Sequence, residues 1–171
     1  MVFSNIDAEK MGLIKQKVED SSTQLQEIVE SIVEPYSRDL DNYIQFIRDI
    51  LEDRQNPPNI QELEDFCMNL STLIYYASCM CEYLGIRDDI SKALYKEIYN
   101  TARDTGRGTV ADKNSLAELE SQQEQLTNIC YARAYKVMKA KVESAQELLT
   151  SCKKIISRRI SEMELTRIGG Q

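Results

Sequence analysis

Residues 63–84 read LEDFCMNLSTLIYYASCMCEYL, and this stretch decides the fold class. Its apolar residues recur in steps of three and four, which places them on one side of an α-helix for three heptads. They are Leu63, Phe66, Leu70, Leu73, Ala77, Met80 and Leu84. Because a single helix cannot bury such a seam, the pattern predicts a partner helix. Asn59 and Glu62 form a capping-box pair that predicts the helix start, and Gly85 predicts its end.

The rest of the chain also favours helices. An apolar stripe predicts a helix over residues 6–34, which Pro35 breaks or restarts, and a further helix runs to Asn56-Pro57-Pro58. A fourth helix is expected from Asp89. After the loop at 105–109, Asp112 or Ser115 is expected to cap a helix that continues to Thr166, a rod of roughly 75 Å at 1.5 Å per residue.

These patterns predict an all-α protein, an elongated helical bundle with a long C-terminal helix. Glycine and proline are scarce, with 6 and 3 residues, which leaves little turn material for a sheet. We expect an acidic N-terminal helical arm over residues 1–58 and a helical core over residues 59–171. The coiled-coil seam and the long rod expose more apolar surface than one chain covers, so a homo-oligomer is expected.

The compartment is inferred from composition. The five cysteines have no spacing typical of a disulfide framework, which favours a reducing environment. The first residues lack the pattern of a signal peptide, and residues 70–84 are too short and polar to span a bilayer. The sequence therefore predicts a cytoplasmic protein, in a host cytoplasm if it is viral, without membrane contact.

Charge is distributed unevenly along the chain. Residues 1–65 carry 15 acids and 6 bases, whereas residues 126–160 carry eight bases and two acids. A basic stretch in an acidic chain is typical of a protein that meets an anion through one region. The spaced cations predict contacts with a single-stranded nucleic-acid backbone without sequence preference. The candidate residues are Arg133, Lys136, Lys139, Lys153, Lys154, Arg158 and Arg159, with Arg107 and Lys113 near the glycine loop.

Two alternatives to nucleic-acid binding remain open for this region. It can be a solvated helix face balanced by the acidic half of the chain, or it can bind another acidic protein. Lys141 and Arg159 fall on the apolar side of the helix, which suits a buried stem or a subunit contact. Tyr131 and Tyr135, beside Arg133 and Lys136, are the only tyrosine pair considered for base stacking.

The sequence offers little for catalysis or metal binding. There is no histidine, and Cys79 and Cys81 lack nearby partners for a zinc site. The loop at 106–109 lacks the Lys-Ser/Thr ending of a nucleotide-binding loop. We expect no enzyme activity, no cofactor and no metal.

From Leu94 onward the chain resembles the UvsY-like recombination mediators of phages. The resemblance rests on a tyrosine-bearing helix end and a Gly-Arg-Gly loop (99–108), Ala111-Asp112-Lys113, a long helix and the cluster at 151–159. It covers about 75 residues, under half the chain, and residues 1–60 have no counterpart. It implies a ring-shaped homo-oligomer that binds single-stranded DNA, with a recombinase and a single-strand-binding protein as partners.

The leading hypothesis is a non-enzymatic, oligomeric accessory factor that binds single-stranded nucleic acid, and the resemblance implies a role in phage recombination. One rival is a structural or scaffold protein, for example of a virion, that makes only protein contacts. Another is an acidic inhibitor of a DNA-binding enzyme, which the charge of residues 1–65 would suit.

Overall fold

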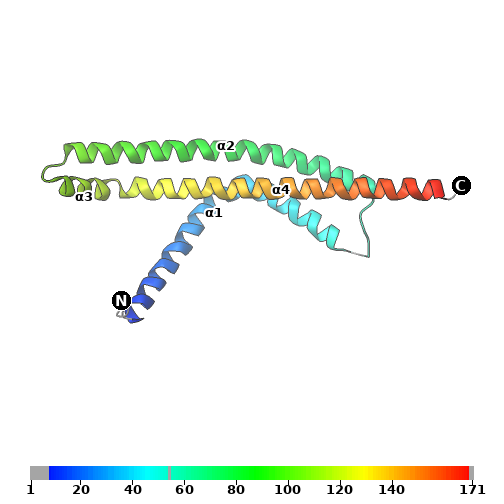
Figure 1. The fold of residues 1–171 in the computed structure, drawn as a ribbon, viewed down its shortest axis with the longest axis horizontal. Helices are drawn as coiled ribbons and strands as arrows, with labels where there is room; N and C mark the ends of the chain where they lie inside the picture. The colour runs from blue at the N-terminus through cyan, green and yellow to red at the C-terminus, as the bar shows by residue number, and fades with distance from the viewer. Residues whose placement is uncertain (1–7, 54, 170–171) are drawn as a thin grey trace.

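The computed structural model describes residues 8–53 and 55–169, which form four α-helices and no strand. They are α1 (Ala8–Glu52), α2 (Ile60–Thr105), α3 (Val110–Glu120) and α4 (Gln122–Gly169). α2 and α4 run antiparallel as a long hairpin, with α3 at its closed end and α1 against one side (Figure 1). The all-α class and the long C-terminal helix predicted from the sequence are confirmed. No helix in the described part of the chain has an apolar stretch long enough to cross a lipid bilayer.

α2 begins at the predicted capping box but does not end at Gly85. The Asn59 side chain accepts from the backbone of Glu62, whose carboxylate accepts from the backbone of Asn59 in return. The helix then continues to Thr105, because Ser91 and Ala102 remain buried beyond Gly85. Gly85 instead allows α2 and α4 to approach each other closely, because a Cβ at this position would lie 3.3 Å from Cε2 of Tyr135. Helix packing thus outweighs the cost of glycine in a helix, about 1 kcal/mol.

α1 also continues through its predicted break at Pro35. A proline inside a helix removes one hydrogen bond and bends the axis without always ending it. Val33 and Ser37, on either side of Pro35, are both 1% exposed. Figure 1 shows α1 rising to the hairpin and turning away from it again. Contact with the hairpin therefore holds the helix together across the proline.

The start of the C-terminal region differs from the prediction as well. Thr109, and neither Asp112 nor Ser115, is the N-cap of α3, with Asp112 as the reciprocal partner in its capping box. Ser121 then separates α3 from α4 with φ −98° and ψ 6°, so the predicted single rod is two helices. The Ser121 hydroxyl is buried and donates to the Ala117 carbonyl oxygen at 2.7 Å, which stabilises this interruption.

The core follows a slightly different seam from the one predicted. Ile74 and Cys81 are buried, whereas Leu73 is only half-buried and Met80 is 36% exposed. A straight helix has 3.6 residues per turn, so a strict seven-residue seam drifts around it by about 20° per heptad. On α4 the buried positions are Ala134, Met138, Val142, Ala145 and Cys152. Leu126 and Val137, two apolar residues of the same helix, are 55% and 38% exposed.

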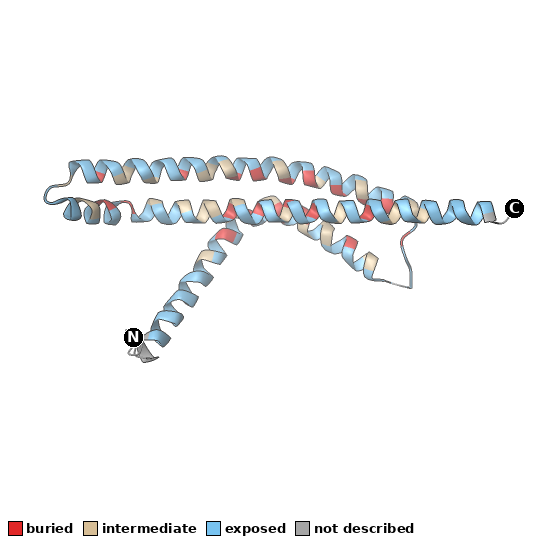
Figure 2. Cartoon of the chain, viewed as in Figure 1, coloured by how far each residue is buried: buried red, intermediate tan, exposed pale blue. Residues whose placement is uncertain are grey.

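Only the second half of α1 belongs to this core. Val29, Val33, Leu40 and Ile47 are buried against the hairpin, and Phe66 of α2 contacts the Phe46 ring edge-on. Residues 11–24 are exposed (Figure 2). The acidic segment expected to be an arm is therefore an arm in its first part and a third core helix in its second.

Candidate nucleic-acid interface

The eight basic residues of α4 between residues 126 and 160 fall into three groups around its axis. At 100° per residue, one group points away from the core, a second lies along the α2 edge, and a third lies towards α1. From the sequence, all of these residues except Lys141 are candidate contacts for an anion, although Lys141 and Arg159 both lie on the apolar side of the helix. The exposure and the contacts of each group determine which of these residues can bind an anion.

The outer group consists of four exposed residues within about 60° of each other on the side opposite Ala134 and Cys152. They are Arg133, Lys136, Lys154 and Arg158. Among the described residues the first three make no ion pair, and Arg158 pairs with Glu162 at 2.8 Å. This pair has side-chain exposures of 80% and 58%, so solvent screens it and it leaves Arg158 accessible.

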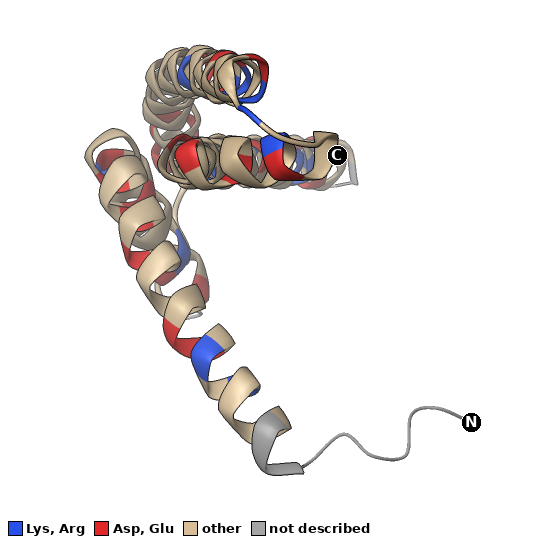
Figure 3. Ribbon diagram, turned by 90° about the vertical axis from the view of Figure 1, so that its left-hand side faces the viewer, with Lys and Arg blue, Asp and Glu red and all other residues tan. Residues whose placement is uncertain are grey.

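The outer face is not continuously positive. Lys136 and Lys154 are 18 residues apart, or about 27 Å along the axis, and Glu147 lies on the same face between them. Figure 3 looks along the hairpin and shows basic and acidic positions on both of its long helices. The four cations therefore form two separate basic pairs, one in the first third of α4 and one in the last third.

The second group, Lys139 and Lys153, is exposed along the α2 edge. Lys139 lines a shallow depression with Glu82 and Glu143, whose carboxylates oppose its charge. Lys153 lies near Cys67: burial raises the pKa of that thiol, and the Lys153 charge partly opposes the rise. Lys139 and Lys153 therefore lie at the edge of the outer face, beside any anion bound there.

The third group, Lys141 and Arg159, is engaged within the chain, as their apolar-side position predicts. Lys141 Nζ is 2.6 Å from Asp41 Oδ2 of α1. Arg159 is half-buried and donates to the Pro58 carbonyl oxygen in the connection between α1 and α2. The contact of Arg159 makes it a structural residue of the hairpin.

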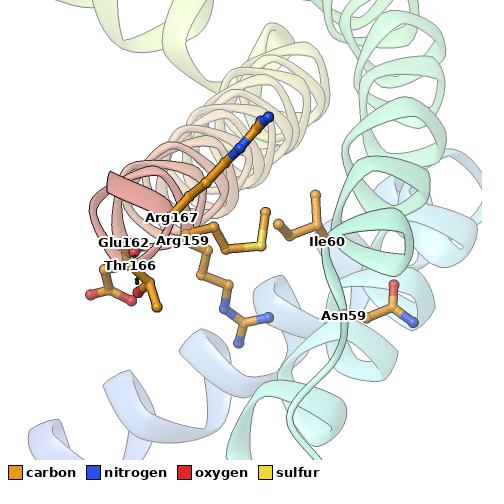
Figure 4. Close-up of a pocket in the computed structure, with 7 residues that line it drawn as sticks. Asn59, Ile60, Arg159, Glu162, Thr166 and Arg167 are labelled. Atoms are coloured by element: carbon orange, nitrogen blue, oxygen red, sulfur yellow. Dashed lines mark hydrogen bonds between the residues drawn. The ribbon is translucent and has the colours of Figure 1, made fainter. Parts of the chain in front are cut away.

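Figure 4 shows Arg159 reaching from α4 towards that connection, beside Asn59 and Ile60. Arg167 and Glu162 line the same open pocket at the end of the hairpin. Arg167 is not among the sequence-predicted contacts, because it lies beyond the basic stretch of residues 126–160. The one signal for it is its spacing of eight residues from Arg159, which places it on a neighbouring part of the helix.

Arg107 and Lys113 lie at the opposite, closed end of the hairpin. Arg107 is exposed in the loop between α2 and α3, and Lys113 is half-buried on α3. From Gln122 to Lys154 the helix rises by about 48 Å. The structure therefore does not bring the nine candidate residues into one site, and these two are remote from the second basic pair.

Tyr131 and Tyr135, the candidates for base stacking, are packed between helices. Tyr131 is half-buried with the Arg87 guanidinium 5.9 Å from its ring centroid, and the Tyr135 ring covers Gly85. The most exposed tyrosines in the described chain are Tyr75 and Tyr76 on α2, at 66% and 60%, and their rings meet edge-on. Base stacking by Tyr131 or Tyr135 would require the helices to separate.

The geometry of the described residues offers exposed surface for binding. Within residues 8–53 and 55–169, no three His, Cys, Asp or Glu side chains are grouped as metal ligands would be. The exposed cations of α4 have the charge and spacing to contact an extended polyanion. Compared with known proteins, the chain matches no family model, no curated protein and no solved structure.

Proposed function

We propose that this protein is a non-enzymatic accessory factor that binds single-stranded nucleic acid through the outer face of α4. The observation that carries the proposal is the grouping of four exposed bases, Arg133, Lys136, Lys154 and Arg158, on the side of α4 that faces away from the core. Two basic pairs along a straight helix suit a flexible phosphate backbone, which can bend to reach both. The acidic surroundings reduce non-specific adhesion to other polyanions.

The resemblance to phage recombination mediators adds the expected context. On that basis the nucleic acid is single-stranded DNA, and a recombinase and a single-strand-binding protein are the proposed partners. The segment of resemblance includes the second basic pair, Lys154 and Arg158, and the loop with Arg107. Arg107 then serves as an outlying contact, which a long strand reaches along the hairpin.

Binding of a fluorescent oligothymidylate, followed by anisotropy, tests the proposal. The affinity should be measurable at about 20 mM salt and should fall steeply as salt rises, because counterions are released from the strand. A duplex of the same length is the control for shape, since an extended strand can follow the two separated basic pairs more closely. Absence of binding by the wild-type protein at low salt would reject the proposal.

A scaffold role is the second candidate, and exposed apolar side chains favour it. Ile14 and Val18 of α1 are 57% and 58% exposed, and Leu94 of α2 is 49% exposed. A protein that failed to bind nucleic acid but assembled through these residues would have this role.

A further inference from the structure

The exposed first part of α1 carries an apolar stripe that continues its buried seam. We call residues 11–24 of α1 the arm. Met11, Ile14 and Val18 follow each other in steps of three and four, and Leu25 lies one heptad after Val18. These positions therefore share the side of α1 that, from Leu25 onward, packs against the hairpin. In the arm this side is open, with exposures of 38%, 57% and 58% for Met11, Ile14 and Val18.

The hairpin has an open groove where the contact with α1 ends. Its lining includes Arg87, Ile90 and Leu94 of α2 and Glu124, Thr127 and Tyr131 of α4. The groove has a volume of about 370 Å³. Ile90 and Leu94 are 55% and 49% exposed, so its apolar surface is uncovered.

The groove extends the interface that α1 already makes. Arg87 lies at the junction: the pKa of its guanidinium is raised mainly by its hydrogen bond to the Tyr83 hydroxyl, with smaller effects from Tyr36 of α1 and from Tyr131. The first part of α1, before Leu25, leads away from the hairpin (Figure 1). A helix that followed the same track beyond Arg87 would lie in the groove.

Glu124 gives the groove a polar requirement. Its Oε2 atom is buried and has no hydrogen-bond partner among the described residues. A buried carboxylate oxygen without a donor is unfavourable, so an occupant that brings an ammonium or hydroxyl group gains by satisfying it. The arm carries Lys15 and Lys17 directly beside Ile14 and Val18. It thus combines the apolar stripe and the donors that the groove requires.

We propose that the arm of one copy of this chain packs into the groove of a second copy. The arm's own groove is out of line, because α1 bends near Pro35 and leads the arm away from the hairpin. Exchange of an identical element between copies reproduces the helix–hairpin contact already present in one chain. This assembly requires no nucleic acid.

Light scattering on the full-length protein without nucleic acid is the first test. At tens of micromolar the wild-type protein should have a mass of two or more copies. Ile14→Asp and Leu94→Asp should each give the monomer mass with unchanged helix content, since both side chains are exposed in the single chain. Leu13→Asp is the matched control: Leu13 is 63% exposed in the same arm but lies about 100° from the stripe, and its variant should assemble normally.

Cross-linking between copies identifies the contact itself. In a Cys79→Ser background, which removes the exposed native thiol, a tagged Ile14→Cys chain is mixed with an untagged Leu94→Cys chain and oxidised. A disulfide-linked product with one tagged and one untagged chain is expected, and neither chain alone should give it. A monomeric wild-type protein, or a chain with both cysteines that cross-links only within itself, would overturn the proposal. Neither outcome bears on DNA binding by α4.

Discussion

Lys141 Nζ lies 2.6 Å from Asp41 Oδ2, so a base of the basic helix is paired with an acid of the acidic N-terminal segment. The same carboxylate accepts from the Ser37 hydroxyl at 2.8 Å, and Ser37 is itself 1% exposed. This three-residue contact fixes α1 to α4 at the middle of the hairpin. It assigns Lys141 to folding and separates it from the outer basic face.

Lys141→Ala should therefore reduce stability without changing nucleic-acid binding. Both side chains of the pair are about one-third exposed, so solvent weakens the interaction and a loss of about 1 kcal/mol in the free energy of unfolding is expected. Urea unfolding followed by circular dichroism measures it. Lys154→Ala is the control, with unchanged stability and weaker DNA binding. Equal effects of both substitutions on DNA binding would contradict this division.

Leu70→Ala should destabilise the hairpin core. Leu70 is 0% exposed, and removal of a buried leucine side chain costs about 2–5 kcal/mol through lost burial and the cavity left behind. Met68→Ala, two residues away and 72% exposed, should change stability by less than about 0.5 kcal/mol. Thermal melts should give a lower melting temperature for Leu70→Ala than for Met68→Ala. The reverse order would contradict the described orientation of α2.

Gly85→Val should disrupt the close contact between α2 and α4. The added Cβ would lie 3.3 Å from the Tyr135 ring, and the branched methyl groups need further space, so a cost of about 1–3 kcal/mol is expected from overpacking. Gly12→Val is the control, because no atom lies within 4 Å of a Cβ at Gly12. The loss of stability caused by Gly85→Val should be smaller when Tyr135→Ala accompanies it. Urea titrations of the wild-type protein, Gly85→Val, Tyr135→Ala and the double variant test this.

The native cysteines should react with iodoacetamide in a fixed order. Burial raises the pKa of the Cys81 and Cys152 thiols, with Glu82 adding to the first shift and Cys67 to the second. At pH 8 these thiols hold less of the reactive thiolate and are also inaccessible. Exposed Cys79 should be alkylated first, as mass spectrometry of digested protein would show. Equal rates for Cys152 and Cys79 in the native protein would contradict the packing.

The α3 capping box should depend on pH in the acid range. Hydrogen bonds from the Thr109 hydroxyl and backbone lower the pKa of Asp112 below its ordinary value of about 3.9. The stabilisation is thus complete above the unfolded-state pKa and is lost as pH falls through the lower folded-state pKa. A carboxyl titration by NMR should give a lower pKa for Asp112 in the wild-type protein than in Thr109→Ala. An unchanged midpoint would exclude the capping box.

The helical fold was predictable because its signals are local. The seam of residues 63–84 and the box of Asn59 and Glu62 depend on neighbours within a few turns. The wrong boundaries at Pro35 and Gly85 have a common cause. At both positions a weak local preference to end the helix is overruled by contacts with distant residues, such as the Tyr135 ring beside Gly85.

The candidate site was predictable only in part, for a related reason. Helical periodicity alone places Arg133, Lys136, Lys154 and Arg158 on one side of a helix and Lys141 and Arg159 on another. Periodicity could not show that Lys141 contacts Asp41 or that Arg159 contacts Pro58, since these partners lie about one hundred positions away in the sequence. The exposed arm and the groove likewise appear only when the helices are placed in space.

The most direct test of nucleic-acid binding by the outer face of α4 is the salt dependence of binding in a matched pair of fourfold variants. One variant removes the outer face of α4: Arg133→Ala, Lys136→Ala, Lys154→Ala and Arg158→Ala. The other removes the same charge from exposed positions elsewhere: Arg38→Ala, Arg48→Ala, Lys92→Ala and Lys96→Ala. In plots of log affinity for oligothymidylate against log salt, the first should flatten the slope by about 3, at roughly 0.7 per lost phosphate contact, and the second should keep the wild-type slope. Equal slopes for the two variants would contradict a nucleic-acid interface on the outer face of α4.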